Sequence, residues 1–250
     1  MKKVKIRIYI DTAMDKGFEI NLNETQSHYL CHVMKVSLGD HVLCFNNKDG
    51  EFLSSVSNIS KKSVSLSLLE KTRDFERVSD TQLIFAPVKK EQTDYIIQKA
   101  TELGIRSLLP VITKYTMNER IKTNRFQLQA IEAAEQSRRV DIPEILNPTT
   151  FSELITSWNK KRTLFYFDET GLGKNILQTF SQAKEDNLSC ISFLIGPEGG
   201  FSQDELNILR NSSFAIGVSL GKRILRAETA VAAALSCWQA IAGDWNDIVK

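Results

Sequence analysis

The chain has 250 residues, of which 42% are hydrophobic and 25% are charged, and its formal net charge is +2. These proportions are typical of a folded protein with a substantial core, and they exclude a disordered or collagen-like chain. The small net charge excludes a uniformly basic surface, so any contact with nucleic acid must use a local patch.

Targeting and membrane segments are not indicated by the sequence. No apolar run reaches the roughly 18–20 residues that a transmembrane helix needs. The first residues, MKKVKIRIYID, contain basic side chains but lack the apolar stretch of a signal peptide. We therefore expect a cytoplasmic protein without a membrane partner.

The cysteines and histidines give no sign of a disulfide framework or a metal centre. The cysteines are far apart and form no Cys-x-x-Cys pair, which is typical of reduced thiols in a cytosolic protein. They are Cys31, Cys44, Cys190 and Cys237. His28 and His32 have the spacing of two ligands on a helix, but no third ligand lies near them in sequence. We expect no bound metal.

The first 72 residues are predicted to be rich in β-structure. Basic and apolar residues alternate in Lys3–Ile10, as in a half-buried strand, and Gln26–Val36 has the apolar spacing of a short helix. Three further strands are predicted, with a hairpin turn at Asn47–Gly50 between the first two. They are His41–Asn46, Glu51–Ile59 and Ser63–Leu69. The pattern favours a small barrel, with Glu70–Thr81 as the linker that follows it.

From Gln82 onward strands alternate with helices, which predicts a parallel sheet covered on both faces. The predicted strands are Leu83–Pro87, Ser107–Ile112, Thr163–Phe167, Ile191–Ile195 and Phe214–Val218. The predicted helices are Gln92–Leu103, Asn124–Arg138, Ser152–Lys160, Asn175–Lys184 and Glu228–Ala242, together with one that begins after Ser202. Gly104 is expected to end its helix, and Ser202 with Glu205 to form a capping box. The alanine-rich last helix is expected to pack closely against another element.

Two glycine-containing turns in Leu194–Ala230 are the most informative feature of the chain. Each follows an apolar run and precedes a helix. The first reads Gly-Pro-Glu-Gly-Gly at Gly196–Gly200, and the second contains Gly221 with Arg223 and Arg226 nearby. Turns of this kind direct backbone N–H and C=O groups outward, which suits a flat, polar small molecule. One such turn alone is usually only a loop, and neither dinucleotide nor phosphate-loop spacing is present.

Taken together, several segments resemble the RsmE family, the SPOUT-class 16S ribosomal RNA (uracil-N3) methyltransferases. The similarity spans nearly the whole chain. The segments are the opening strand with Arg7 and Tyr9, His28-Tyr-Leu…Val-Met-Lys-Val…Gly-Asp, Gln98-Lys-Ala-Thr-Glu-Leu-Gly-Ile, Glu132-Ala-Ala-Glu-Gln-Ser-Arg-Arg, Gly196-Pro-Glu-Gly-Gly-Phe, and Leu220-Gly-Lys-Arg-Ile-Leu-Arg-Ala-Glu-Thr-Ala. The chain departs from the family at Lys35, where arginine is usual, and at Arg138, where glycine is usual.

The resemblance implies an α/β protein with two domains. Residues 1–72 would form a PUA-like β-barrel that binds RNA. Residues 73–250 would form a SPOUT domain with a parallel sheet and a trefoil knot that binds S-adenosylmethionine. The substrate would be a uridine of 16S rRNA in the small ribosomal subunit, methylated at N3. The protein would be a homodimer, and the final helix with Trp238 is compatible with such an interface.

The resemblance also implies the residues of the site. Arg226 is the catalytic candidate, because a guanidinium beside the base can stabilise charge that develops on it. The expected cofactor-binding residues are Leu194, Gly196, Pro197, Glu198, Gly199, Gly200, Leu220, Gly221, Ile224, Leu225 and Arg226. The expected RNA-binding residues are Arg7, His28, Lys35, Lys89, Lys90, Arg138 and Arg139. The proton acceptor stays open among Glu198, Glu228, a backbone carbonyl and water.

Three alternatives stay open at the level of sequence. The chain could be a non-catalytic RNA-binding or ribosome-assembly protein that has kept the fold. It could be a nucleotide- or phosphate-binding α/β enzyme that uses Gly196–Gly200 as an anion loop. It could also be a methyltransferase that acts on another base or another RNA, because target choice depends on loop shape and RNA contacts.

Overall fold

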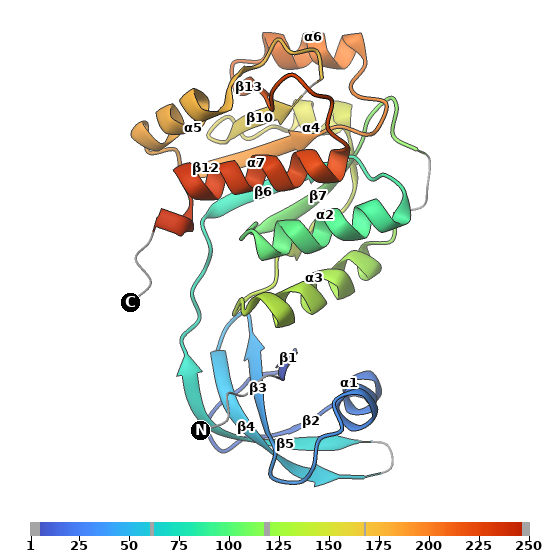
Figure 1. The fold of residues 1–250 in the computed structure, drawn as a ribbon, viewed down its shortest axis with the longest axis vertical. Helices are drawn as coiled ribbons and strands as arrows, with labels where there is room; N and C mark the ends of the chain where they lie inside the picture. Colours follow the sequence, from blue (N-terminus) through green and yellow to red (C-terminus); the bar gives the residue numbers. More distant parts are fainter. Residues whose placement is uncertain (1–5, 61–62, 118–120, 168, 247–250) are drawn as a thin grey trace. The chain divides into compact units, whose positions relative to one another are not determined.

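The computed structural model describes residues 6–60, 63–117, 121–167 and 169–246, which form two compact units (Figure 1). The first unit runs to Arg77 and also contains Ala134–Ile142, and the second comprises the remainder. The boundary expected after residue 72 falls inside a strand, Val64–Arg73, whose pairing continues to its end. Sequence patterns gave no reason to assign Ala134–Ile142 to the first unit.

The first unit contains one five-stranded sheet in the order β1-β3-β4-β5-β2. Its strands are β1 (Arg7–Tyr9), β2 (Glu19–Asn21), β3 (His41–Asn46), β4 (Gly50–Ile59) and β5 (Val64–Arg73). Only β1 and β3 are parallel; the other ladders are antiparallel. Alternate residues of the strands meet in an apolar core that includes Ile8, Val42 and Leu66. The β-rich character predicted for this part of the chain is confirmed.

A short helical segment lies between β2 and β3, and it differs from the single helix predicted over Gln26–Val36. The α-helix α1 covers Glu24–His28, and a π-helical turn, η1, follows over Tyr29–Val33. The side chain of Asn23 accepts a hydrogen bond from the Gln26 N–H, 2.9 Å between the heavy atoms, and so caps α1. The segment ends near Lys35, which has a left-handed φ of 53°.

The second unit contains an eight-stranded sheet in which every described ladder is parallel. The main order is β11-β13-β10-β12-β6-β7-β8, and β9 pairs with β7. The strands are β6 (Asp80–Phe85), β7 (Ser107–Ile112), β8 (Glu144–Ile145), β9 (Thr149–Thr150), β10 (Thr163–Phe167), β11 (Lys174–Asn175), β12 (Cys190–Ile195) and β13 (Ala215–Ser219). The predicted parallel sheet is therefore confirmed, although the two-residue strands were not foreseen.

Helices cover both faces of this sheet (Figure 1). They are α2 (Lys90–Glu102), α3 (Thr123–Ser137), α4 (Phe151–Thr156), α5 (Ile176–Glu185), α6 (Gln203–Asn211) and α7 (Ala227–Ile241), with a short 3-10 turn, η2 (Asp244–Asn246), at the end. Leu83 and Phe85 of β6 point to the face covered by α2, α3, α5 and α7. Ile84, between them, points to the face covered by α4 and α6. No helix in the described ranges is long and apolar enough to cross a bilayer.

Local signals at two helix ends are confirmed. Gly104 has a φ of 77°, and the Ile105 N–H bonds the Ala100 carbonyl at 3.0 Å, which is the six-to-one bond of a Schellman motif. Ser202 and Glu205 form the predicted capping box of α6. The Glu205 carboxylate also accepts from the Lys114 N–H, at 2.8 Å, so this cap ties the loop after β7 to α6.

The close packing predicted for the last helix is also found, within the chain itself. Helix α7 contacts α2 and α5. Trp238 is 5% exposed and packs among the rings of Phe165, Phe180 and Phe193. Its indole is therefore part of the core of its own unit, which removes it as an indicator of a subunit interface.

Candidate active site

The topology of the second sheet brings the two glycine turns to one edge. β10 pairs with β12 on one side and with β13 on the other, and all three strands are parallel. Their carboxyl ends therefore lie together, which is where open α/β sheets bind ligands. The turn Gly196–Gly200 follows β12, the segment Leu220–Arg226 follows β13, and the end of β10 lies between them.

A cavity of about 820 Å³ opens at this edge. Gly196–Gly200 and Leu220–Arg226 line it, with Phe167 from the end of β10 between the two loops. Pockets of roughly 300–1,000 Å³ accommodate small molecules and cofactors, so the volume is appropriate for one nucleoside-sized ligand. All of the expected cofactor-binding residues line the cavity except Leu194.

The expectation for Leu194 needs a correction. Its side chain is fully buried in the core cluster on the α4 and α6 face of the sheet, where it packs with Leu164 and Leu206. Strand alternation explains the difference, since Ile195, the next residue, faces the cavity instead. A side-chain contact between Leu194 and a ligand in the cavity is therefore excluded by the fold.

Two glycines of the first turn lie where other residues would not fit. A Cβ atom on Gly199 would approach the Tyr115 Cβ to 3.1 Å. Gly200 has a φ of 69°, and a Cβ there would collide with the carboxylate of Glu169. Glycine thus suits the backbone conformation at Gly200, and a side chain at either position would require a neighbouring side chain to move.

Charged side chains of both signs line the cavity. Arg226 is exposed and stands at the N-cap position of α7, where its side chain makes no capping hydrogen bond. Lys89, Lys222 and Arg223 add positive charge to the lining, while Glu169 and Glu198 supply carboxylates. Positive and negative groups thus surround one small-molecule site, and the N-terminal end of α7 adds a favourable dipole for negative charge.

The fold places the two carboxylates that were left open as proton acceptors in different surroundings. Glu198 lines the cavity, but Glu228 is half-buried on α7 and is not part of the lining. Glu169, which sequence reasoning missed, lies in the loop after β10, and its carboxylate faces Gly200. The only available signal was its place just beyond a predicted strand, at the edge where the two glycine turns were also expected.

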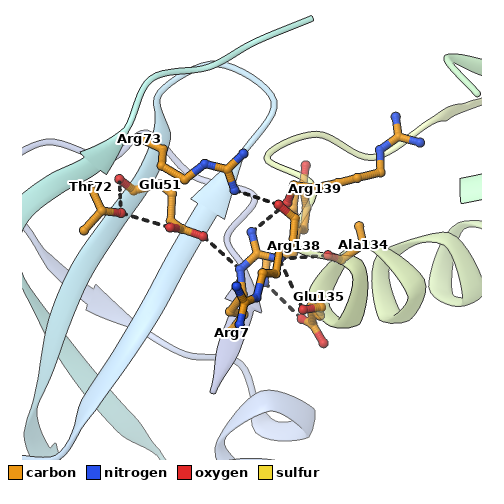
Figure 2. A network of polar contacts seen from close by, with 9 residues as sticks. Arg7, Glu51, Thr72, Arg73, Ala134, Glu135, Arg138 and Arg139 are labelled. Atoms are coloured by element: carbon orange, nitrogen blue, oxygen red, sulfur yellow. Dashed lines mark hydrogen bonds and ion pairs between the residues drawn. The ribbon is translucent and has the colours of Figure 1, made fainter. Parts of the chain in front are cut away.

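Two arginines expected to bind RNA are instead buried and fully engaged in the first unit, as Figure 2 shows for Arg7. The Arg7 guanidinium pairs with Glu51 and donates to backbone carbonyls of Ala134, Glu135 and Arg139. Burial lowers the pKa of Arg7, and the Glu51 carboxylate opposes that shift. Arg139 pairs with Asp141 at 2.8 Å, with both side chains at most 10% exposed. Both guanidinium groups are thus occupied by partners within the unit, an arrangement that disfavours the expected phosphate contacts.

The other expected RNA-binding side chains are exposed. They are His28, Lys35, Lys89, Lys90 and Arg138. Lys89 also lines the cavity. The His28 and His32 rings stack on each other, with 4.3 Å between their centroids. Within the described residues no group of three His, Cys, Asp or Glu side chains could hold a metal ion.

The fold and the site define a class of protein: an α/β domain with a ligand cavity at the carboxyl ends of parallel strands, joined to a small β-rich domain. The family described as RNA methyltransferase domain matches residues 76–239. The family described as RNA methyltransferase PUA domain matches residues 22–69. The β-rich first unit is thus a PUA-type domain.

Individual relatives agree with this assignment. Ribosomal RNA small subunit methyltransferase E of Rickettsia conorii is 32% identical over 92% of this chain and 93% of its own length. The enzyme of the same name from Bacillus subtilis is 30% identical over 84% and 85%. The crystal structure of the Neisseria gonorrhoeae protein of that name, bound to S-adenosylmethionine, superimposes with a TM-score of 0.84 at 26% identity, covering 96% of this chain and 99% of that one. The chain belongs to the ribosomal RNA small subunit methyltransferase E family.

Proposed function

We propose that the protein transfers the methyl group of S-adenosylmethionine to N3 of a uridine in 16S rRNA of the small ribosomal subunit, in the cytoplasm. The observation that carries the proposal is the convergence of both glycine loops and Arg226 on one cavity. Family membership supports the reaction class and the cofactor, because the Neisseria gonorrhoeae relative holds S-adenosylmethionine. The choice of base rests on the resemblance to the RsmE family.

The cavity suits this cofactor. Its glycine turns expose backbone groups for a purine ring and ribose, and its lining contains both apolar residues, such as Ile195 and Leu225, and ionised ones. Ile224 is 82% exposed and lies in the cavity lining, where its side chain is accessible to a ligand. When bound, S-adenosylmethionine supplies a methyl group already activated by its sulfonium.

The protein's own contribution to the chemistry is electrostatic. N3 of uracil carries a proton at neutral pH, and its loss leaves negative charge that spreads onto O2 and O4. Arg226, placed at the cavity without an internal cap bond, is positioned to stabilise that charge. A carboxylate on the same lining is a suitable proton acceptor; Glu169 and Glu198 meet that requirement, whereas Glu228 does not reach the cavity lining.

The target base must be unpaired when it reacts, because N3 lies on the Watson–Crick edge. A separate RNA-binding domain would supply the free energy for holding such a base, and the PUA-type unit is the candidate. Exposed cations of the PUA-type unit and of the cavity, including Lys35 and Lys89, would contact RNA phosphates. Such contacts orient the RNA and add affinity, but they do not recognise its base sequence. We further propose that the protein acts as a homodimer, as the resemblance implies.

The decisive experiment is a methyl-transfer assay with labelled S-adenosylmethionine and small ribosomal subunits that lack the modification. Mass spectrometry of the digested RNA identifies the methylated base. A single N3-methyluridine in 16S rRNA supports the proposal, and a methyl group on another base or another RNA contradicts the stated target. Cofactor binding without transfer to any RNA would favour a non-catalytic role.

A further inference from the structure

The last residues of α3, from Ala134 onward, belong to the first unit and are held there by arginine side chains of the same unit (Figure 2). Arg7 donates to the Ala134, Glu135 and Arg139 carbonyls at 2.8, 3.2 and 2.7 Å. Arg73 donates to the Arg138 carbonyl at 2.7 Å. The last carbonyls of a helix have no partner within it and carry the negative end of its dipole. The two arginines therefore act as an external cap for this helix end.

The cap fixes Arg138 in an unusual backbone conformation. Helix α3 ends at Ser137, and Arg138 follows with a φ of 63°. This left-handed conformation is unfavourable for a residue other than glycine, which is why glycine is common just after helix ends. Arg73 donates to the Arg138 carbonyl and Arg7 donates to the Arg139 carbonyl. The backbone on the C-terminal side of the Arg138 Cα is therefore held by two consecutive hydrogen bonds.

Arg138 and Arg73 are the exposed arginines of this cluster, and the Arg73 guanidinium is bonded to the Arg138 carbonyl. Arg7 is enclosed with Glu51, and Arg139 is enclosed with Asp141. The side chain of Arg138 is exposed, and in the described part of the chain its guanidinium makes no hydrogen bond or ion pair. Arg138 thus has a long basic side chain at a position whose backbone conformation favours glycine, and hydrogen bonds from Arg7 and Arg73 stabilise that backbone.

We propose that Arg138 contacts a backbone phosphate of the RNA substrate, and that Arg7 and Arg73 are positioning residues that hold its peptide in the presenting conformation. The proposal rests on the proposed RNA methyltransferase function. Of the three arginines expected at the RNA, Arg7, Arg138 and Arg139, it keeps only Arg138 as a phosphate ligand, and it gives Arg7 and Arg73 a supporting role. A strained residue retained at an exposed position is a reason to look for function.

The test uses the full-length protein, with 16S rRNA or modification-free subunits as the probe. Arg138→Gly removes the charge and also the backbone strain, so RNA binding and stability should move in opposite directions. We expect RNA affinity to fall several-fold, and the slope of log affinity against log salt to become shallower by about 0.7–0.9, as for one lost phosphate contact. The unfolding midpoint should stay unchanged or rise, and S-adenosylmethionine affinity should be unchanged.

Two further variants separate charge from backbone. Arg138→Lys keeps the charge and should restore most of the salt slope, whereas Arg138→Gln removes the charge but keeps the backbone strain and should bind RNA like Arg138→Gly. Asn187→Gly is the matched control, because Asn187 is exposed, follows helix α5 and has a φ of 53°. Asn187→Gly should change stability in the same direction as Arg138→Gly does, without changing RNA affinity or the dependence of that affinity on salt.

The positioning role of Arg73 is tested by a double-mutant cycle. If Arg73 acts through Arg138, then Arg73→Met should weaken RNA binding in the wild-type background and have little effect in Arg138→Gly. Additive effects would overturn the positioning role. Unchanged RNA affinity and salt slope in both Arg138→Gly and Arg138→Gln would overturn the phosphate contact. Failure of the proposed function is distinct, since the wild-type protein would then transfer no methyl group to the same RNA.

Discussion

Arg7 and Glu51 form a buried ion pair, with 2.8 Å between Nε and Oε2 and side chains that are only 5% and 6% exposed. Glu51 also accepts from the Thr72 hydroxyl at 3.0 Å, and the remaining guanidinium nitrogens bond backbone carbonyls. Buried charges are tolerated when their hydrogen-bonding groups are satisfied in this way. The pair therefore closes a polar network inside the first unit, in which the Arg7 guanidinium is occupied by partners of that unit.

This network makes a prediction about stability. Arg7→Ala should lower the free energy of unfolding of the first unit by about 3–5 kcal/mol, because it leaves the Glu51 carboxylate buried without its partner. Urea unfolding followed by circular dichroism provides the measurement. Arg77→Ala, at an exposed position close in sequence to β5, is the control and should change stability little. A small effect of Arg7→Ala would show that water replaces the guanidinium.

Arg226→Ala should separate catalysis from binding. Because Arg226 is exposed and makes no capping bond, its loss should leave stability within about 0.5 kcal/mol of wild type. The rate of methyl transfer should fall by about 10²–10³-fold if the guanidinium stabilises charge on the base. Single-turnover transfer and calorimetric titration of the cofactor are the two measurements. Lys184→Ala, an exposed basic residue of α5 outside the cavity lining, controls for a general loss of positive charge.

Gly199→Val should block the cavity. Its Cβ would already lie 3.1 Å from the Tyr115 Cβ, so the branched methyl groups would force a shift of the turn that lines the cavity. We expect at least a tenfold loss of S-adenosylmethionine affinity, with Gly199→Ala showing a smaller loss. Undiminished cofactor affinity in a folded Gly199→Val protein would remove this turn from the binding site.

Cys44 provides a prediction about pH. Burial raises the pKa of its thiol from 9.0 to about 11. The unfolded chain would lose this proton near pH 9 and the folded chain only near pH 11, so the folded state becomes progressively less stable between these values. The loss amounts to at most about 3 kcal/mol. In Cys44→Ala the fall in unfolding free energy from pH 8 to pH 10 should be smaller than in wild type, and equal falls would contradict the assignment.

Local chemistry in the sequence predicted much of the second unit. Gly104 and the Ser202 capping box act through neighbours within a few residues, so their signals are present in a short stretch of sequence. The apolar runs of β7 and β10 likewise gave the strand limits that the structure shows. Two-residue strands such as β8 and β11 are too short to carry any periodic pattern.

Long-range contacts explain what the sequence could not supply. The partners of Arg7 include backbone carbonyls 127 to 132 positions away, and every residue type carries such a carbonyl. The sequence pattern around an arginine in a strand is the same whether its side chain is exposed to solvent or bonded within a buried network. Glu169 was missed for a related reason, because its place in the cavity depends on which strands flank β10.

The first unit is discontinuous along the chain, since it comprises residues up to Arg77 and a second piece, Ala134–Ile142. A recombination event that exchanged only the N-terminal piece between relatives would combine one lineage's Arg7 and Arg73 with another lineage's loop. Such a chimera would keep both partners' backbone carbonyls but could change the residue at position 138 and the geometry around it. A domain-exchange experiment that is to preserve these contacts would therefore have to move both pieces together.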